Sequence, residues 1–175
     1  MRDPKKWGIA VVGLLAGVLV LAAVRRYGLT VDAALTIPTI VLLAGAGIVD
    51  IQRKIIPDWL TLPGLLWVLG TSAFSGWPRV ADALLGLSLC GGLLLIFAVI
   101  SRGAVGGGDV KLIAIIGASL GWQWGFGVLA FAQLSAALLA VCLFITGRRG
   151  GKDTLPFGPF LATFAMLAMV GRPMQ

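Results

Sequence analysis

The sequence contains no histidine and no glutamate, and charged residues make up only 12% of its 175 positions. Without histidine, Ser-His-Asp and Cys-His catalytic sites are excluded, and so is the HExxH type of zinc site. All seven acidic residues are aspartates, at positions 3, 32, 50, 58, 82, 109 and 153. Any carboxylate chemistry must therefore use these side chains.

Cysteine is also scarce. Cys90 and Cys142 each lie inside an apolar run, and neither belongs to a CxxC pair. A lone cysteine in such a run usually acts as a small apolar residue, so we interpret both as buried packing residues. No metal site and no cofactor are expected.

Apolar residues dominate the chain, at 59% of positions, and the mean hydropathy is +1.02. Soluble domains carry about 25% charged residues. The composition predicts an all-α, polytopic transmembrane helix bundle that forms one domain over residues 1–175. The net charge of +7 does not indicate nucleic-acid binding, because the basic residues form short clusters between apolar runs, as in cytoplasmic loops.

About 20 residues are needed to cross the hydrocarbon core as a helix. Seven candidate spans follow, the fifth being the least secure: 8–24, 32–51, 59–75, 82–101, 110–123, 125–146 and 156–171. The first span follows basic residues as a signal peptide does, but it lacks a convincing cleavage site, so we expect it to be retained. Small-xxx-small spacings at Gly13/Gly17, Gly117/Gly121 and Gly121/Gly125 predict close helix packing.

The distribution of basic residues predicts the orientation. With the N-terminus inside, ten lysines and arginines fall on the inner side and four on the outer side. The positive-inside rule favours this arrangement. It also places Asp50 and Asp109 at the cytoplasmic ends of their spans, on the same side of the membrane.

Asp50 and Asp109 stand out because each lies at the edge of an apolar segment. An ionisable group at membrane depth costs at least about 2.5 kcal/mol, so it indicates a functional site by default. A purely structural interpretation also exists for each: Asp50 as an end-of-helix charge paired with Arg53 or Lys54, and Asp109 as a helix N-cap after a flexible loop. Two such carboxylates together favour acid/base chemistry.

Two irregular segments accompany the aspartates. Gly106, Gly107 and Gly108 immediately precede Asp109, and glycine permits close backbone approach of an extended peptide. The segment Pro156-Phe157-Gly158-Pro159 begins the last span, and irregular backbone at this depth is tolerated only beside protein or a cavity.

Together these motifs resemble the type IV prepilin peptidases, which are GxGD-type aspartic proteases of the membrane. The resemblance rests on Asp50 followed by Ile56-Pro57, on the run Gly106–Asp109 continuing as VKLIAIIGASLG, and on 156–159. It implies that Asp50 and Asp109 are catalytic. From the residues themselves we expect Lys111, the three glycines and residues 156–159 to form a substrate-binding or active-site loop region. Because it has no CxxC pair, the sequence resembles the short form of the family, which lacks the methyltransferase and zinc segment.

The resemblance further implies a bacterial or archaeal inner-membrane enzyme that cleaves pilin or pseudopilin precursors after a short basic leader. Two carboxylates suit peptide hydrolysis, because one can act as general base while the other, protonated, polarises the carbonyl. Helix dipoles favour Asp109 as the anion, at a helix start, and Asp50 as the holder of the shared proton. Because the inner loops are basic too, we expect anionic lipids to attract the leader.

Two other functions remain open from the sequence. Intramembrane aspartates also relay protons in transporters and channels. The chain could instead be a non-catalytic membrane component of pilus assembly. No inverted repeat supports a transporter, and retention of both aspartates with the glycine run argues against a non-catalytic scaffold.

Overall fold

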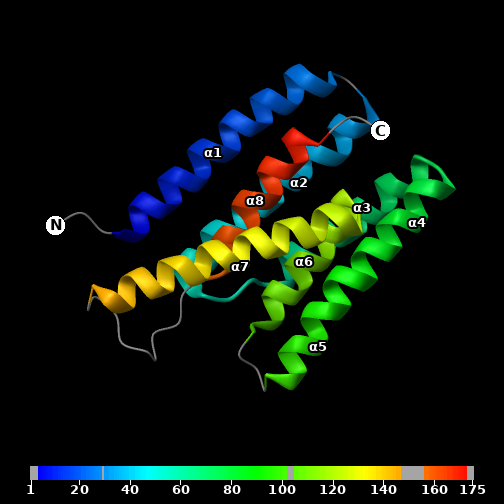
Figure 1. The fold of residues 1–175 in the computed structure, drawn as a ribbon. Helices are drawn as coiled ribbons and strands as arrows, with labels where there is room; N and C mark the ends of the chain where they lie inside the picture. Colours follow the sequence, from blue (N-terminus) through cyan, green and yellow to red (C-terminus); the bar gives the residue numbers. More distant parts are fainter. Residues whose placement is uncertain (1–3, 29, 102–104, 147–155, 173–175) are drawn as a thin grey trace.

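The computed structural model describes residues 4–28, 30–101, 105–146 and 156–172. Within these ranges the chain is helical and contains no strand, which confirms the predicted fold class. The helices run back and forth as one bundle (Figure 1). Their bounds are α1 Pro4–Tyr27, α2 Val31–Arg53, α3 Asp58–Phe74, α4 Trp77–Gly86, η1 Leu87–Gly91, α5 Gly92–Ile100, α6 Gly107–Leu120, α7 Trp122–Ile145 and α8 Gly158–Gly171.

The fourth predicted span is one continuous helical segment, but its backbone hydrogen-bond pattern changes part of the way along. A π-helical turn, η1, joins α4 directly to α5 without an intervening loop. Such turns commonly bulge out of an α-helix where packing or function demands it. Here η1 presents the buried residues Cys90 and Gly91 to the bundle interior.

Helix α6 lies at the centre of the bundle. It packs against α2, α3, α4, η1, α5, α7 and α8, and its residues from Leu112 to Leu120 are almost all buried. With 14 residues it is about 21 Å long at 1.5 Å per residue, shorter than the hydrocarbon core. A single turn residue, Gly121 with φ +82°, separates it from α7.

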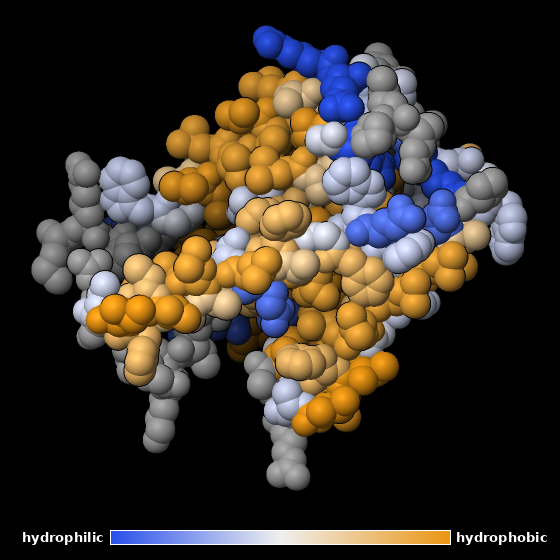
Figure 2. All heavy atoms as spheres, viewed as in Figure 1, coloured by the Kyte–Doolittle hydropathy of each residue, from blue (hydrophilic) through white to orange (hydrophobic). Residues whose placement is uncertain are grey.

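Among the residues that the structure describes, four helical segments are long and apolar enough to cross a membrane: Lys6–Tyr27, Asp32–Arg53, Arg79–Ile100 and Trp122–Ile145. Helix α8 is apolar but shorter. Large apolar side chains such as Leu14, Leu66 and Leu138 are exposed on the outside of the bundle, and Figure 2 shows broad hydrophobic areas on one face. These features fit a multi-pass membrane protein, while the number of seven spans and the orientation stay predictions.

Glycines allow the closest helix contacts, although not all those predicted. A Cβ on Gly117 would lie 2.3 Å from the Gly86 carbonyl oxygen, and one on Gly125 would lie 2.6 Å from the Cys90 sulfur. Gly13 and Gly17 do not serve this role, because a Cβ at either position would meet nothing within 4 Å. The prediction of close packing was therefore wrong for this pair.

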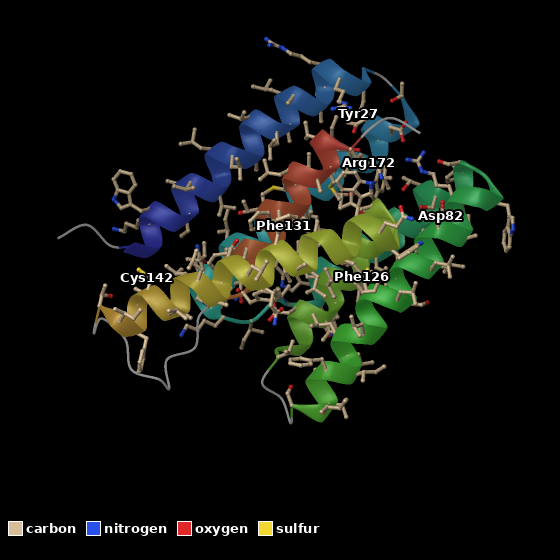
Figure 3. All side chains as sticks on the ribbon, viewed as in Figure 1. Tyr27, Asp82, Phe126, Phe131, Cys142 and Arg172 are labelled. Atoms are coloured by element: carbon tan, nitrogen blue, oxygen red, sulfur yellow. The ribbon has the colours of Figure 1, made fainter. Side chains whose placement is uncertain are left out.

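The two cysteines differ in their surroundings. Cys90 is fully buried, as predicted. Cys142 is exposed near the C-terminal end of α7 (Figure 3), so the prediction that it is buried was wrong. An apolar run does not reveal which face of a helix points outward when the whole helix lies in an apolar medium.

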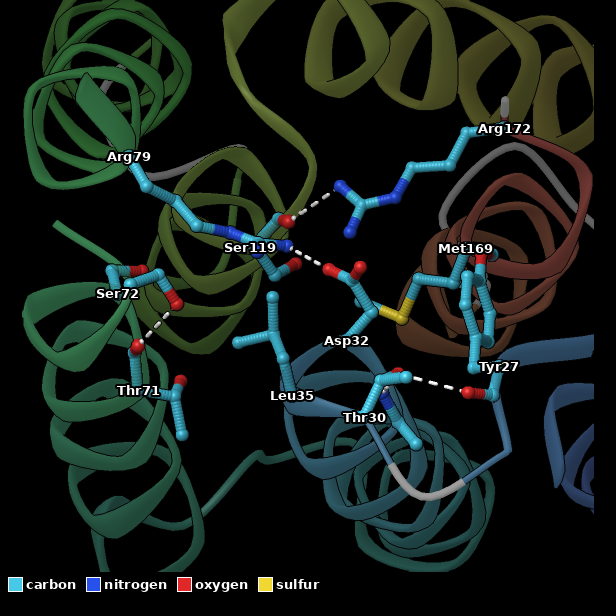
Figure 4. Close-up of polar contacts among 12 residues, drawn as sticks. Tyr27, Thr30, Asp32, Leu35, Thr71, Ser72, Arg79, Ser119, Met169 and Arg172 are labelled. Atoms are coloured by element: carbon cyan, nitrogen blue, oxygen red, sulfur yellow. Dashed lines mark hydrogen bonds and ion pairs between the residues drawn. The ribbon is translucent and has the colours of Figure 1, made fainter. Parts of the chain in front are cut away.

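The end of the bundle opposite Asp50 is tied together by polar contacts (Figure 4). Arg79 forms an ion pair with Asp32, near the start of α2, and Arg172 donates to the backbone oxygen of Ser119 at 3.0 Å. The Tyr27 hydroxyl donates to the backbone oxygen of Met169 at 2.8 Å. These bonds join α1, α2, α4, α6 and α8 at the end of the bundle that lies away from Asp50.

Candidate active site

Asp50 lies in the last turn of α2, and its side chain is only 5% exposed. The helix ends at Lys54, which adopts the left-handed conformation with φ 55° and whose N–H donates to the Asp50 backbone oxygen at 2.8 Å. The chain then extends through the buried Ile56 to Pro57, which precedes α3.

The Asp50 carboxylate is held by the start of another helix. Its Oδ2 accepts a hydrogen bond from the backbone N–H of Gly158 at 2.9 Å. Gly158 is the first residue of α8, whose N-terminal N–H groups have no partner within the helix. The alternative interpretation of Asp50, as an end-of-helix charge paired with Arg53 or Lys54, does not account for this bond to α8.

Glycine at position 158 allows this close approach. A Cβ there would lie 2.9 Å from Asp50 Oδ2 and 3.0 Å from the carboxyl carbon. Nearby, a Cβ on Gly47 would lie 3.3 Å from Ala162 Cβ and 3.5 Å from Pro159 Cα, so α2 and α8 pack closely along this edge.

Asp109 lies in the first turn of α6, at its third residue. The N-cap of the helix is Gly106, which makes no side-chain cap bond. The alternative interpretation of Asp109 as the N-cap was therefore wrong. A Cβ on Gly106 would meet Asp109 Oδ2 at 3.4 Å, so the carboxylate lies over the glycine run.

The structure brings the two aspartates to one cavity of about 120 Å³. Asp50 reaches the cavity from the end of α2, and Asp109 reaches it from the start of α6. Its other lining residues come from the chain after α2 and from the glycine run: Lys54, Ile55, Ile56, Gly106, Gly107 and Gly108. Since a water molecule occupies about 30 Å³ in the liquid, the cavity that both carboxylates line has room for water.

A second, larger cavity of about 310 Å³ also reaches Asp109. It lies between α5 and α7, and its lining is mostly apolar: Leu94, Val105, Gln133, Ala136, Ala137, Ala140 and Phe157. Asp109 is the residue that the two cavities share. Of this lining, only Asp109 and Phe157 had been singled out from the sequence.

The remaining candidate residues differ in whether they line a cavity. Phe157 lines the second cavity, while Pro156 and Pro159 are half-buried beside it in sequence. Lys111 points elsewhere and forms an ion pair with the exposed Asp58 at the start of α3. Lys111 lines neither cavity, which separates it from the other candidates. Asp153 lies outside the described residues.

The bond from Gly158 bears on which aspartate holds the negative charge. Both carboxylates lie at the start of a helix: Asp109 is in the first turn of α6, and the side chain of Asp50, a residue of α2, contacts the first residue of α8. The helix macrodipole therefore does not distinguish them. A hydrogen bond to a charged group is worth about 1.5–3 kcal/mol, more than the roughly 0.3–1 kcal/mol of a macrodipole. The assignment of the negative charge to Asp109 stays a prediction, and the helix-dipole argument no longer supports it. Sequence spacing gave no signal of this bond, because 108 positions separate its partners.

Most of this chain is similar to known proteins of one family. Residues 37–145 match the model of the type IV leader peptidase family. The chain is 32% identical over 150 residues to a prepilin leader peptidase/N-methyltransferase of Pseudomonas putida, covering 83% of this chain and 52% of that protein. It is 31% identical over 155 residues to the Bacillus subtilis protein of the same name, covering 89% and 62%.

A third relative of the same name, from Burkholderia pseudomallei, is 33% identical over 169 residues, covering 92% of this chain and 54% of the relative. The chain thus spans about half the length of the curated relatives it matches. No solved structure gives a significant match.

Proposed function

The chain belongs to the type IV leader peptidase family, and from that premise we propose that it is a membrane aspartic endopeptidase acting on prepilin-like precursors. The observation that carries the proposal is the single cavity lined by Asp50 and Asp109, at the end of the bundle where the glycine run begins α6. A proton relay through a membrane would need ionisable groups along a path, whereas these two lie together at one end.

The proposed reaction is hydrolysis of one peptide bond. A water between the carboxylates gives a proton to the ionised aspartate as its oxygen attacks the carbonyl carbon, while the protonated aspartate donates to the carbonyl oxygen. The tetrahedral intermediate then collapses. The C–N bond breaks, the amine leaves with a proton from the pair, and the other fragment becomes a carboxylic acid. Two adjacent carboxylates share one proton readily, because both cannot easily be ionised together.

The surrounding residues suit this chemistry. The N–H of Gly158 donates to Oδ2 of Asp50 and so holds the carboxylate from one side. Gly108 packs so closely on Ile56, with a built Cβ 2.8 Å from Ile56 Cβ, that the loop after α2 and the glycine run are held together. This contact sets the position of Asp109 relative to Asp50.

The proposed substrate is a pilin or pseudopilin precursor, cut between a short basic leader and an apolar helix. We place the enzyme in the bacterial or archaeal cytoplasmic membrane with this cavity on the cytoplasmic side. The support is the basic residues near the same end, including Arg53, Lys54 and Lys111, together with the positive-inside rule.

The test is cleavage of candidate precursors by the purified protein in detergent. Asp50→Asn and Asp109→Asn keep the side-chain size and remove the titrating proton, so each should lower the rate at least about 100-fold. Asp82→Asn is the matched control, because Asp82 is exposed at the opposite end of the bundle. Normal accumulation of all three variants shows that insertion is intact.

Retention of more than a few per cent of activity in either Asp50→Asn or Asp109→Asn would contradict the dyad. Failure of the unsubstituted protein to cleave any precursor, together with proton flux through liposomes that depends on the same two aspartates, would instead favour a transporter.

A further inference from the structure

The larger cavity is a groove whose two walls separate. Helices α4 and η1 contact α7, but α5 does not, among the residues that the structure describes. The two walls therefore part at the π-helical turn, and Figure 1 shows α5 and the C-terminal half of α7 diverging toward the end where α6 begins. Asp109 lies at the base of the space between them.

The α7 wall of the groove is a single helical stripe. Gln133, Ala136, Ala137 and Ala140 follow the spacing i, i+3, i+4, i+7, and all four line the cavity. The three alanines let another helix approach closely, which is how helices pack in a membrane. Around the stripe, large side chains such as Leu134, Leu138 and Val141 remain exposed.

Gln133 is the exception in this apolar wall. It is the twelfth of the 24 residues of α7, and so lies at the middle of a membrane-spanning segment. Its side chain is exposed. Among the described residues its amide has no hydrogen-bond partner. An unpaired amide in hydrocarbon costs several kcal/mol, so this position needs a polar partner from outside the chain.

We propose that the groove receives the apolar segment of the precursor from within the bilayer, and that Gln133 hydrogen-bonds the precursor backbone as a positioning residue. This inference rests on the proposed function. A peptide bond must leave the helix to be hydrolysed, and the first turn of the remaining helix then has up to four N–H groups without partners. In hydrocarbon no water can satisfy them. The side-chain oxygen of Gln133 can accept one such bond.

The groove suits a precursor segment better than a second copy of the chain, because it is continuous with the candidate catalytic carboxylate. Asp109 borders both cavities, so a helix lying along the alanine stripe would end beside the carboxylate pair. A contact between two copies would gain nothing from that continuity and would block the cavity.

The first test measures precursor cleavage in liposomes by Gln133→Leu. We expect kcat/KM to fall about tenfold, since one hydrogen bond is lost, and Gln133→Asn to recover part of the loss. Gln123→Leu is the control, because Gln123 is exposed on the same helix but lies at its N-terminal end, outside the groove. Equal rates for Gln133→Leu and Gln123→Leu would overturn the role of Gln133.

The second test maps the groove by photo-crosslinking. A benzophenone amino acid replaces Ala137 in the groove or Leu138 on the neighbouring exposed face, in an Asp50→Asn background that holds the precursor uncleaved. We expect the precursor to crosslink at least fivefold more at position 137. Equal labelling at both positions, or labelling of a second copy or of lipid alone at 137, would overturn the docking site.

The two proposals fail differently. If the unsubstituted protein cleaves precursor while these variants behave like their controls, the endopeptidase stands and the groove assignment falls. If the unsubstituted protein cleaves no precursor, both fall.

Discussion

At the scale of single residues, the contact between Asp50 and Gly158 holds the site together. The glycine brings the backbone of α8 to within 2.9 Å of the carboxylate, and no other residue fits there without moving it. Because the contact is made by main chain, its geometry is fixed by how α8 packs on α2. The position of Asp50 therefore depends on helix packing as well as on its own rotamer.

We expect Gly158→Ala to lower cleavage at least about tenfold, since a displacement of around 1 Å at a catalytic group can cost 100-fold. The added Cβ would lie 3.0 Å from the Asp50 carboxyl carbon, so the carboxylate must shift or lose its hydrogen bond. The measurement is kcat/KM for precursor cleavage in detergent.

Gly70→Ala is the matched control, because Gly70 also lies within a helix, α3, and a Cβ there meets nothing within 4 Å. If Gly158→Ala cleaves as fast as Gly70→Ala, the hydrogen bond from α8 does not position Asp50.

The sequence allowed candidate site residues to be identified, but it did not allow the contacts between them to be predicted. Asp50 and Asp109 are recognisable because a charge beside an apolar run is rare and costly. Gly158 could be listed as part of a loop, but its bond to Asp50 depends on two helix ends that meet only in the folded bundle. Gln133 was missed because one amide in an apolar helix gives no periodic signal.

At the scale of helices, glycine sets the distance between α4 and α6. A Cβ on Gly86 would lie 1.9 Å from the Gly117 oxygen, which is backbone and cannot rotate away. On the next turns, Gly91 meets Ala114 and Gly125 meets Cys90 at similarly short range. These contacts bring α4, η1 and α7 against the buried α6.

We expect Gly86→Val to lower the midpoint of thermal unfolding in detergent by at least about 5 °C, because overpacking costs roughly 1–3 kcal/mol or more. Gly13→Val is the control, since a side chain at Gly13 meets nothing within 4 Å. Equal midpoints for the two variants would show that the α4–α6 contact is looser than the structure has it.

The helices themselves could be predicted well from the sequence, and their interruptions could not. Long apolar runs bounded by charged or Gly/Pro residues predicted helices close to α1, α2, α3 and α7. The π-helical turn at Leu87–Gly91 packs against α6, and local sequence does not encode that contact. The burial of α6 similarly depends on every neighbour around it.

At the scale of the whole molecule, the two ends of the bundle differ in kind. One end is joined by bonds such as Arg79–Asp32 and Arg172–Ser119, and the other holds two carboxylates beside loops rich in glycine. One end tied by polar bonds and one end lined by the carboxylates suit the proposed enzyme, which would admit a substrate at the second end while the first holds the helices together.

The basic character of the accessible end has a consequence for the substrate. The chain carries a net charge of +7, with Arg53 and Lys54 closing α2 near the cavity. The proposed leader is basic too, so direct attraction to the protein is weak. Anionic lipid headgroups attract polybasic segments by about 1 kcal/mol per charge, and both partners would be drawn to the same surface.

We therefore expect cleavage in liposomes to rise several-fold as anionic lipid replaces neutral lipid, and this gain to shrink as salt is raised, because screening shortens the range of the attraction. The measurement is the initial rate at fixed surface density of enzyme and precursor. A precursor whose leader lysines and arginines are replaced by glutamine is the matched control, and its rate should not respond to lipid charge. Equal rates for the native precursor in neutral and anionic liposomes would mean that the leader is recognised by the protein alone.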